Sequence, residues 1–202
     1  MVGFLLVGLL STQCSPAGSS GGDDIPEGKA IQAPASKWTF KPSAMPVGQE
    51  FNLVFLTLRN VTDHAIRIRG IEPISAEGVP TVARIVGIDL IPRRGVVGRH
   101  LPMGAYQSYP PIIKVNGVCR TASIRPPSGF VLSPEGPVAL IATRFRAVGI
   151  GTAKMTGQRV TYEQDGTVFQ QFLPIKVRVR VRENAKPRPS TPTERECRDE
   201  RN

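Results

Sequence analysis

The chain has 202 residues, which is enough for one ordinary domain with flanking segments. Hydrophobic residues make up 40% and allow a packed core, while 20 Gly and 19 Pro favour turns and argue against long helices. The formal net charge of +10 arises in the central part, because residues 1–36 carry three acids and one lysine. A positive field favours solubility and anionic partners, and it carries no information about the fold.

The first ten residues, MVGFLLVGLL, are apolar throughout. They are too few to span a bilayer and have the length of the hydrophobic part of a signal peptide. Cys14 follows, and a Ser-, Gly- and Pro-rich stretch comes after it. This arrangement resembles a bacterial lipoprotein precursor. The resemblance implies that Cys14 becomes the lipidated first residue of an exported protein, anchored in the cell membrane at its outer face or elsewhere in the cell envelope.

Two alternatives for the N-terminus stay open, a plain cleaved signal peptide and a cytosolic protein with an apolar start. On the lipoprotein interpretation, residues 1–14 form the signal and lipidation segment. Residues 15–36 have no periodic apolar face, so we expect them to form a flexible tether. Trp38 and Phe40 alternate with polar residues and open the first expected strand.

Residues 49–59, QEFNLVFLTLR, place apolar side chains on both faces of an extended chain, which predicts a buried strand. A polar turn at residues 60–63 leads to residues 65–71, where isoleucines alternate with arginines. These two strands and their short turn resemble the paired core strands of bacterial immunoglobulin-like domains, which implies a β-sandwich. The turn also contains an Asn-Val-Thr glycosylation sequon, which we interpret as turn chemistry.

Residues 72–135 contain three expected strands, at 81–91, 112–118 and 121–124. Between the first two lies a Gly- and Pro-rich stretch that is longer than an ordinary connection. We expect this central insertion to be a long loop. The sheet resumes at residue 138.

The clearest structural signal is a hairpin at residues 158–182. Asp165-Gly166 is a preferred two-residue hairpin turn, because both positions need a positive φ. After the turn, valines alternate with four cations, Lys176, Arg178, Arg180 and Arg182. We interpret the cations as the solvent face of a half-buried strand, where they also discourage edge-to-edge aggregation.

The pattern as a whole predicts an all-β protein with one antiparallel immunoglobulin-like β-sandwich at residues 37–183. The charged segment 184–202 is expected to be disordered. If Cys14 carries lipid, Cys119 and Cys197 remain as one candidate disulfide, which an oxidising compartment permits.

No arrangement of residues indicates an enzyme, since GxSxG, HExxH and P-loop motifs are missing from the sequence. No cofactor is expected. His100 and Met103 suit copper(I), but two ligands are too few for a metal site, so none is assigned. The candidate binding loop combines cations with aromatic rings and consists of Arg93, Arg94, Arg99, His100, Tyr106 and Tyr109.

The sequence therefore favours a non-enzymatic module of the cell envelope that contacts another protein or an anionic polymer. Nucleic acid is not expected, because export removes such partners and no nucleic-acid-binding signature is present. One alternative is a structural subunit of a surface assembly that pairs through sheet edges. The other is a secreted copper-handling protein that uses His100 and Met103.

Overall fold

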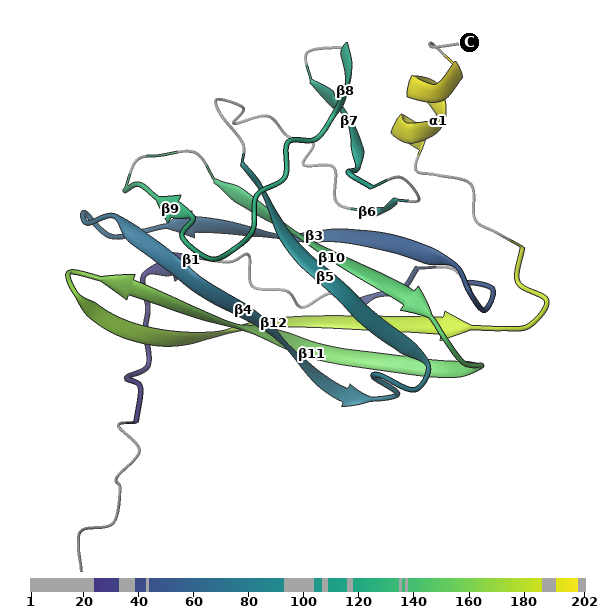
Figure 1. The fold of residues 1–202 in the computed structure, drawn as a ribbon, viewed down its shortest axis with the longest axis horizontal. Helices are drawn as coiled ribbons and strands as arrows, with labels where there is room; N and C mark the ends of the chain where they lie inside the picture. The colour runs from purple at the N-terminus through teal and green to yellow at the C-terminus, as the bar shows by residue number, and fades with distance from the viewer. Residues whose placement is uncertain are drawn as a thin grey trace, which may run out of the picture.

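The computed structural model describes most of the chain between residues 24 and 199 as two facing β-sheets (Figure 1). The described residues are 24–32, 39–42, 44–92, 104–106, 109–115, 118–134, 136, 138–186 and 192–199. The all-β expectation is confirmed, and the long strands of both sheets cross the molecule along its longest axis (Figure 1).

Sheet one has the order β1-β3-β10-β5, with β6 beside β3, and all its pairs are antiparallel. Its strands are β1 (Ile31–Gln32), β3 (Glu50–Asn60), β5 (Ala83–Pro92), β6 (Gly104–Tyr106) and β10 (Ala139–Ala147). Sheet two has the order β2-β12-β11-β4-β9. In this sheet β2 and β12 are parallel, and the other three strand pairs are antiparallel. Its strands are β2 (Thr39–Phe40), β4 (Ile66–Glu77), β9 (Val131–Leu132), β11 (Gly151–Gln164) and β12 (Thr167–Val181).

The core lies between the two sheets and is made by side chains that alternate along each strand. Phe51 and Phe145 stack with their ring centroids 5.4 Å apart, and Val177, Val179 and Val181 of β12 are buried in the same core. A polar pair joins the two sheets inside the core. The buried Gln158 amide of β11 donates a hydrogen bond to the buried Thr143 hydroxyl of β10 at 3.0 Å. Burial of alternate residues is what the period-two patterns predict.

The hairpin prediction is confirmed. Asp165 and Gly166 have φ values of +49° and +77° and form the turn between β11 and β12. Positive φ at both positions matches the right-handed twist of the two strands. β11 begins at Gly151, which is seven residues before the expected start at 158, because its first half pairs with the cationic half of β12.

The other strand predictions hold only in part. β3 and β5 lie close to the expected 49–59 and 81–91. The strand expected at 121–124 is wrong, since residues 122–124 lie in no strand. The strand expected at 112–118 is shorter, and β7 (Ile112–Val115) forms a hairpin with β8 (Val118–Thr121). The expected pairing of the strands at 49–59 and 65–71 is wrong, because β3 and β4 lie in opposite sheets and the turn between them carries the chain across the sandwich.

The flexible tether predicted for residues 15–36 is wrong for residues 24–32, which lie along the sandwich and include β1. The side chain of Gln171 exchanges two hydrogen bonds with the backbone of Ile31, one accepted from its N–H at 3.0 Å and one donated to its carbonyl at 2.7 Å. These bonds come from a residue 140 positions away, so no local pattern signals them. The ordered domain therefore starts before residue 37.

The disorder predicted for residues 184–202 is also wrong over α1 (Pro192–Asp199). The buried Cys197 on this helix is bonded to Cys119 in β8, with a Cα–Cα distance of 5.4 Å. The structure thus contains the disulfide that the sequence left open. In the described part of the chain, no helix has the length and apolar character needed to cross a membrane.

Candidate functional site

Most of the residues singled out in the sequence lie outside the described part of the chain, namely Cys14, Arg93, Arg94, Arg99, His100 and Met103. The two tyrosines of the candidate binding loop are placed. Tyr106 ends β6, opposite Asn52 of β3, and Tyr109 follows three positions later, before β7. No group of three or more metal-binding side chains occurs among the described residues.

Tyr109 is part of a polar cluster on sheet one. Its hydroxyl donates a hydrogen bond to the Asp89 carboxylate of β5, and the guanidinium carbon of Arg144 lies 4.4 Å from the centroid of its ring. Gly87 makes room for this guanidinium, since a Cβ there would lie 2.8 Å from Arg144 Nη2. Arg144 covers one face of the ring, so this aromatic side chain anchors its segment to the sheet.

The environment of Tyr109 keeps its hydroxyl protonated. Burial, followed by the hydrogen bond to Asp89, raises the pKa of Tyr109 to about 12. A neutral hydroxyl is the form that can donate to the carboxylate. The cluster is therefore a stable structural contact, and the prediction that Tyr109 offers its ring to a partner has no support in this geometry.

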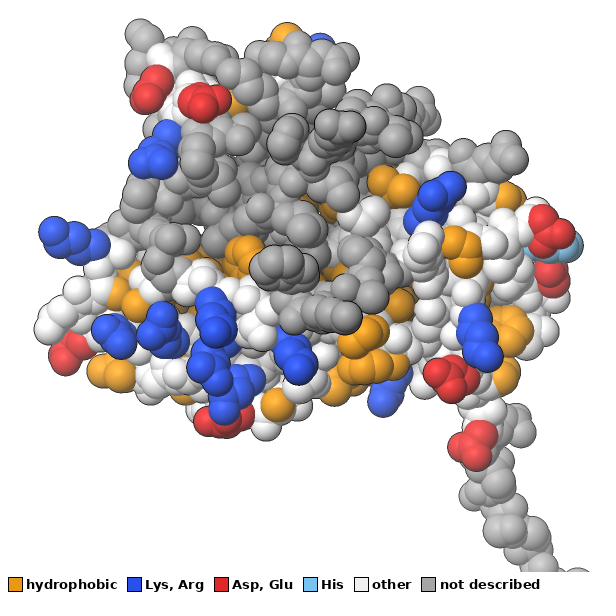
Figure 2. Space-filling model, turned by 180° about the vertical axis from the view of Figure 1, so that it is seen from behind, with side chains coloured by type: hydrophobic (Ala, Val, Ile, Leu, Met, Phe, Trp, Pro, Cys, Tyr) orange, Lys and Arg blue, Asp and Glu red, His pale blue; other side chains and the backbone are white. Residues whose placement is uncertain are grey.

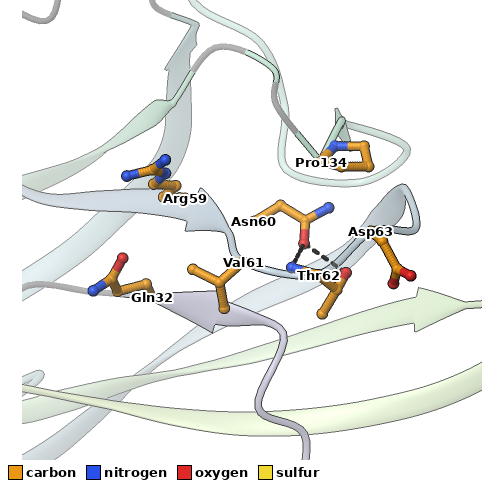
Figure 3. A pocket seen from close by; sticks show the side chains of 7 residues that line it. All are labelled: Gln32, Arg59, Asn60, Val61, Thr62, Asp63 and Pro134. Carbon is orange, nitrogen blue, oxygen red and sulfur yellow. Dashed lines mark hydrogen bonds between the residues drawn. The ribbon is translucent and has the colours of Figure 1, made fainter.

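An open depression of about 810 Å³ lies where β1 meets the end of β3 (Figure 3). Its lining residues are Gln32, Arg59, Asn60, Val61, Thr62, Asp63 and Pro134. These residues include no nucleophile paired with a base, so the depression lacks the parts of a hydrolytic site.

Asn60 at the edge of this depression has a structural role. Its amide nitrogen donates to the carbonyl oxygens of His64 at 2.7 Å and Leu132 at 3.0 Å. Its carbonyl oxygen accepts from the backbone N–H and the hydroxyl of Thr62, at 3.0 and 2.8 Å (Figure 3). The side chain is 3% exposed and both amide hydrogens are used, which confirms that this sequon serves the turn.

The strongest candidate surface is the cationic row, which we define as Lys176, Arg178, Arg180 and Arg182. All four residues are exposed, and the three valines between them are buried. The row runs along the second half of β12 and just past its end. Figure 2 shows Lys and Arg side chains gathered toward this end of the sandwich.

Neighbouring strands add further cations to the row. Lys154 of β11 lies directly opposite Arg178, and the exposed Lys41 follows β2, whose Phe40 pairs with Val177. Like charges directly opposite one another on adjacent strands are destabilising. Lys154 and Arg178 form one such pair, and the row therefore needs a compensating carboxylate beside it.

Two described carboxylates border the cationic row, namely the exposed Glu183 directly after Arg182 in the chain and Glu77. Glu77 of β4 lies opposite Lys154 and forms an ion pair with it. The hydrogen bond and charge of Lys154, with a smaller effect from Arg178, lower the pKa of Glu77. The Glu77 carboxylate thus stays ionised and balances Lys154, while the row itself keeps its excess of positive charge.

The other half of the outer face of sheet two carries three exposed arginines, Arg67, Arg69 and Arg159, and two glutamates, so its charges nearly balance. Arg69 pairs with Glu163, and Arg159 lies directly opposite Glu72. The contrast between the two halves shows that the excess positive charge of this face lies along the second half of β12. Sequence reasoning found the row but interpreted it as the solvent face of a strand, and it did not place Lys41 and Lys154 beside it.

No known protein family and no curated protein matches this chain. The chain is similar to part of the Vibrio cholerae VesB protease, with 7% identity and a TM-score of 0.36, covering 75% of this chain and 32% of the protease chain. It is also similar to the ASH/PapD-like domain 7 of human CEP192, with 8% identity and a TM-score of 0.35, covering 91% of this chain and all of that domain. Likenesses of this size assign no activity, so the function has to be argued from the site.

Proposed function

We propose that the protein is a non-enzymatic binding module of the bacterial cell envelope, exported and anchored through lipidated Cys14. In this proposal the domain is an immunoglobulin-like sandwich, and its partner is an anionic polymer or another anionic surface bound by the cationic row. The observation that carries the proposal is the unbalanced charge of the row beside a nearly balanced half of the same face.

The geometry of β12 supports the row as a binding surface. β11 pairs with β12 along its length, and on the other side Met45 exchanges hydrogen bonds with the backbone of Arg180 and Arg182, at 2.9 and 3.0 Å. The backbone that carries the cations is thus held on both sides. Binding then has to order only the side chains, which lowers its entropic cost.

The expected affinity of one module is low. A Lys or Arg near an anionic surface contributes about 1 kcal/mol, so four residues give about 4 kcal/mol, which corresponds to a Kd on the order of 1 mM. Many anchored copies acting on one polymer would bind much more tightly than a single copy. A weak surface of this kind therefore suits a membrane-anchored protein.

The place where the N-terminal segment joins the sandwich also supports a membrane-anchored protein with the row exposed to a partner. Glu27 forms a β-bridge with Gln170 near the start of β12, and the row ends at Arg182. Twelve residues of strand separate these points, a distance of about 40 Å at ~3.3 Å per residue. An anchor at the N-terminal side would leave the row at the far end of the domain, where it can reach a partner.

The test is retention on a polyanionic matrix such as phosphocellulose. R178Q/R180Q removes two cations of the row, and R67Q/R159Q removes two from the nearly balanced half of the same face. We expect the first variant to elute at clearly lower salt than wild type and the second to elute close to wild type. Equal elution of both variants would mean that net charge alone controls retention, and the proposed site would be wrong.

The proposed anchoring is tested separately by mass spectrometry of the mature protein from a bacterial envelope fraction. The expected product begins at Cys14 and carries lipid. A chain that still begins at Met1 would contradict export through this segment.

A further inference from the structure

We infer that the partner of the cationic row is a linear phosphodiester polymer that lies along β12, with its charges matched to the strand period. The inference rests on the proposed function and specifies the chemistry of the partner. It follows from the spacing, the shape and the composition of the row.

The spacing comes from strand geometry. Residues that alternate along a strand are about 6.6–6.8 Å apart, so the four cations from Lys176 to Arg182 extend over about 20 Å. Buried Val177, Val179 and Val181 fix this period, because each holds the backbone between two cations. A polymer with one anionic group about every 7 Å can meet each cation in turn without stretching or looping.

The shape of the charged region favours a line over a plane. The row follows one strand, and Glu77 borders it two strands away, beyond Lys154. A flat anionic membrane brought against the outer face of sheet two would also cover the half where Arg69 and Arg159 offset Glu163 and Glu72, so it would gain little there. A linear polymer along β12 would meet the cations and avoid these carboxylates.

The composition of the row favours phosphate. Three of its four residues are arginines, whose planar guanidinium groups bind phosphate oxygens with two hydrogen bonds. The row itself contains no aromatic side chain on which a nucleic-acid base could stack. The nearest exposed ring on the same face of β12, Phe172, lies four residues before Lys176 and packs over Gly157. We therefore assign it to the backbone of a polymer with non-aromatic repeats.

Synthetic phosphodiester oligomers test the inference with the full mature chain. Propanediol phosphate oligomers of two, four and eight repeats have closely spaced charges, and hexaethylene glycol phosphate oligomers carry the same number of charges at wider spacing. We expect the affinity for the propanediol series to rise steeply from two to four repeats and then only slowly. The widely spaced series should bind several-fold more weakly at equal charge.

Salt dependence supplies a second readout. Four phosphate contacts on a single strand give a slope of log affinity against log salt of about −2.8, and R178Q/R180Q should reduce it to about −1.4. R67Q/R159Q should keep the wild-type slope. Circular dichroism and thermal unfolding of each variant confirm that the fold is retained.

The outcomes separate the inference from the proposed function. One outcome is binding to phosphatidylglycerol vesicles that depends on the row, with no preference for oligomer length or spacing. This outcome would overturn the inference of a linear polymer and would leave the proposal of an anionic partner standing. Loss of row dependence on phosphocellulose, vesicles and oligomers alike would overturn both.

Discussion

Asn60→Ala is expected to be strongly destabilising, although Asn60 lies at a surface turn. The substitution removes four hydrogen bonds that join the end of β3 to the following turn and to Leu132 of β9. It also leaves the carbonyl of Leu132 without this donor, in a buried contact. A hydrogen bond contributes about 1 kcal/mol net, and a buried group left without its partner costs about 1–3 kcal/mol. We expect the free energy of unfolding to fall by about 3 kcal/mol.

Urea denaturation and thermal unfolding measure this loss. For a domain of this size, 3 kcal/mol corresponds to a fall in Tm of about 6–12 °C. Asp63→Ala is the matched control, because it changes the same turn at a side chain that is 91% exposed and should stay within about 0.5 kcal/mol of wild type. An Asn60→Ala protein as stable as the Asp63→Ala protein, with an unchanged m-value, would refute the reasoning.

Three further predictions concern the disulfide, the buried tyrosine and the core polar pair. Cys197→Ser should release α1, because this helix is short and charged and cannot stay helical alone. Amide hydrogen exchange should then rise in α1 and stay unchanged in the sandwich, and persistent protection of α1 would contradict the prediction. Tyr109 should form its phenolate only at about pH 12 in the folded protein. The stability due to its raised pKa is therefore present below pH 10 and lost as the pH rises through 12. In an ultraviolet titration the Tyr109→Phe protein should lack this late step, and an unchanged titration would argue against the assignment. Thr143→Val alone should lower the free energy of unfolding by about 1–3 kcal/mol, because it leaves the Gln158 amide without its partner. Adding Gln158→Leu should recover much of this loss. Additive losses in denaturation experiments would show that the two residues are not coupled.

The sequence by itself determined the local features of the sandwich. The alternation of valines with cations defined the two faces of β12, and Asp165-Gly166 located the turn before it. Both signals depend on neighbouring residues, since a strand repeats every two positions and a tight turn needs a positive φ at particular positions. The cationic row was visible for the same reason.

Only the tertiary structure decided which distant residues meet. It assigned β3 and β4 to opposite sheets, held Ile31 with Gln171 and joined Cys119 to Cys197. Each of these results depends on the register between segments far apart in the chain, which a period-two pattern leaves open. The same register placed Lys154 opposite Arg178 and turned one charged strand into the most basic part of the described surface of sheet two.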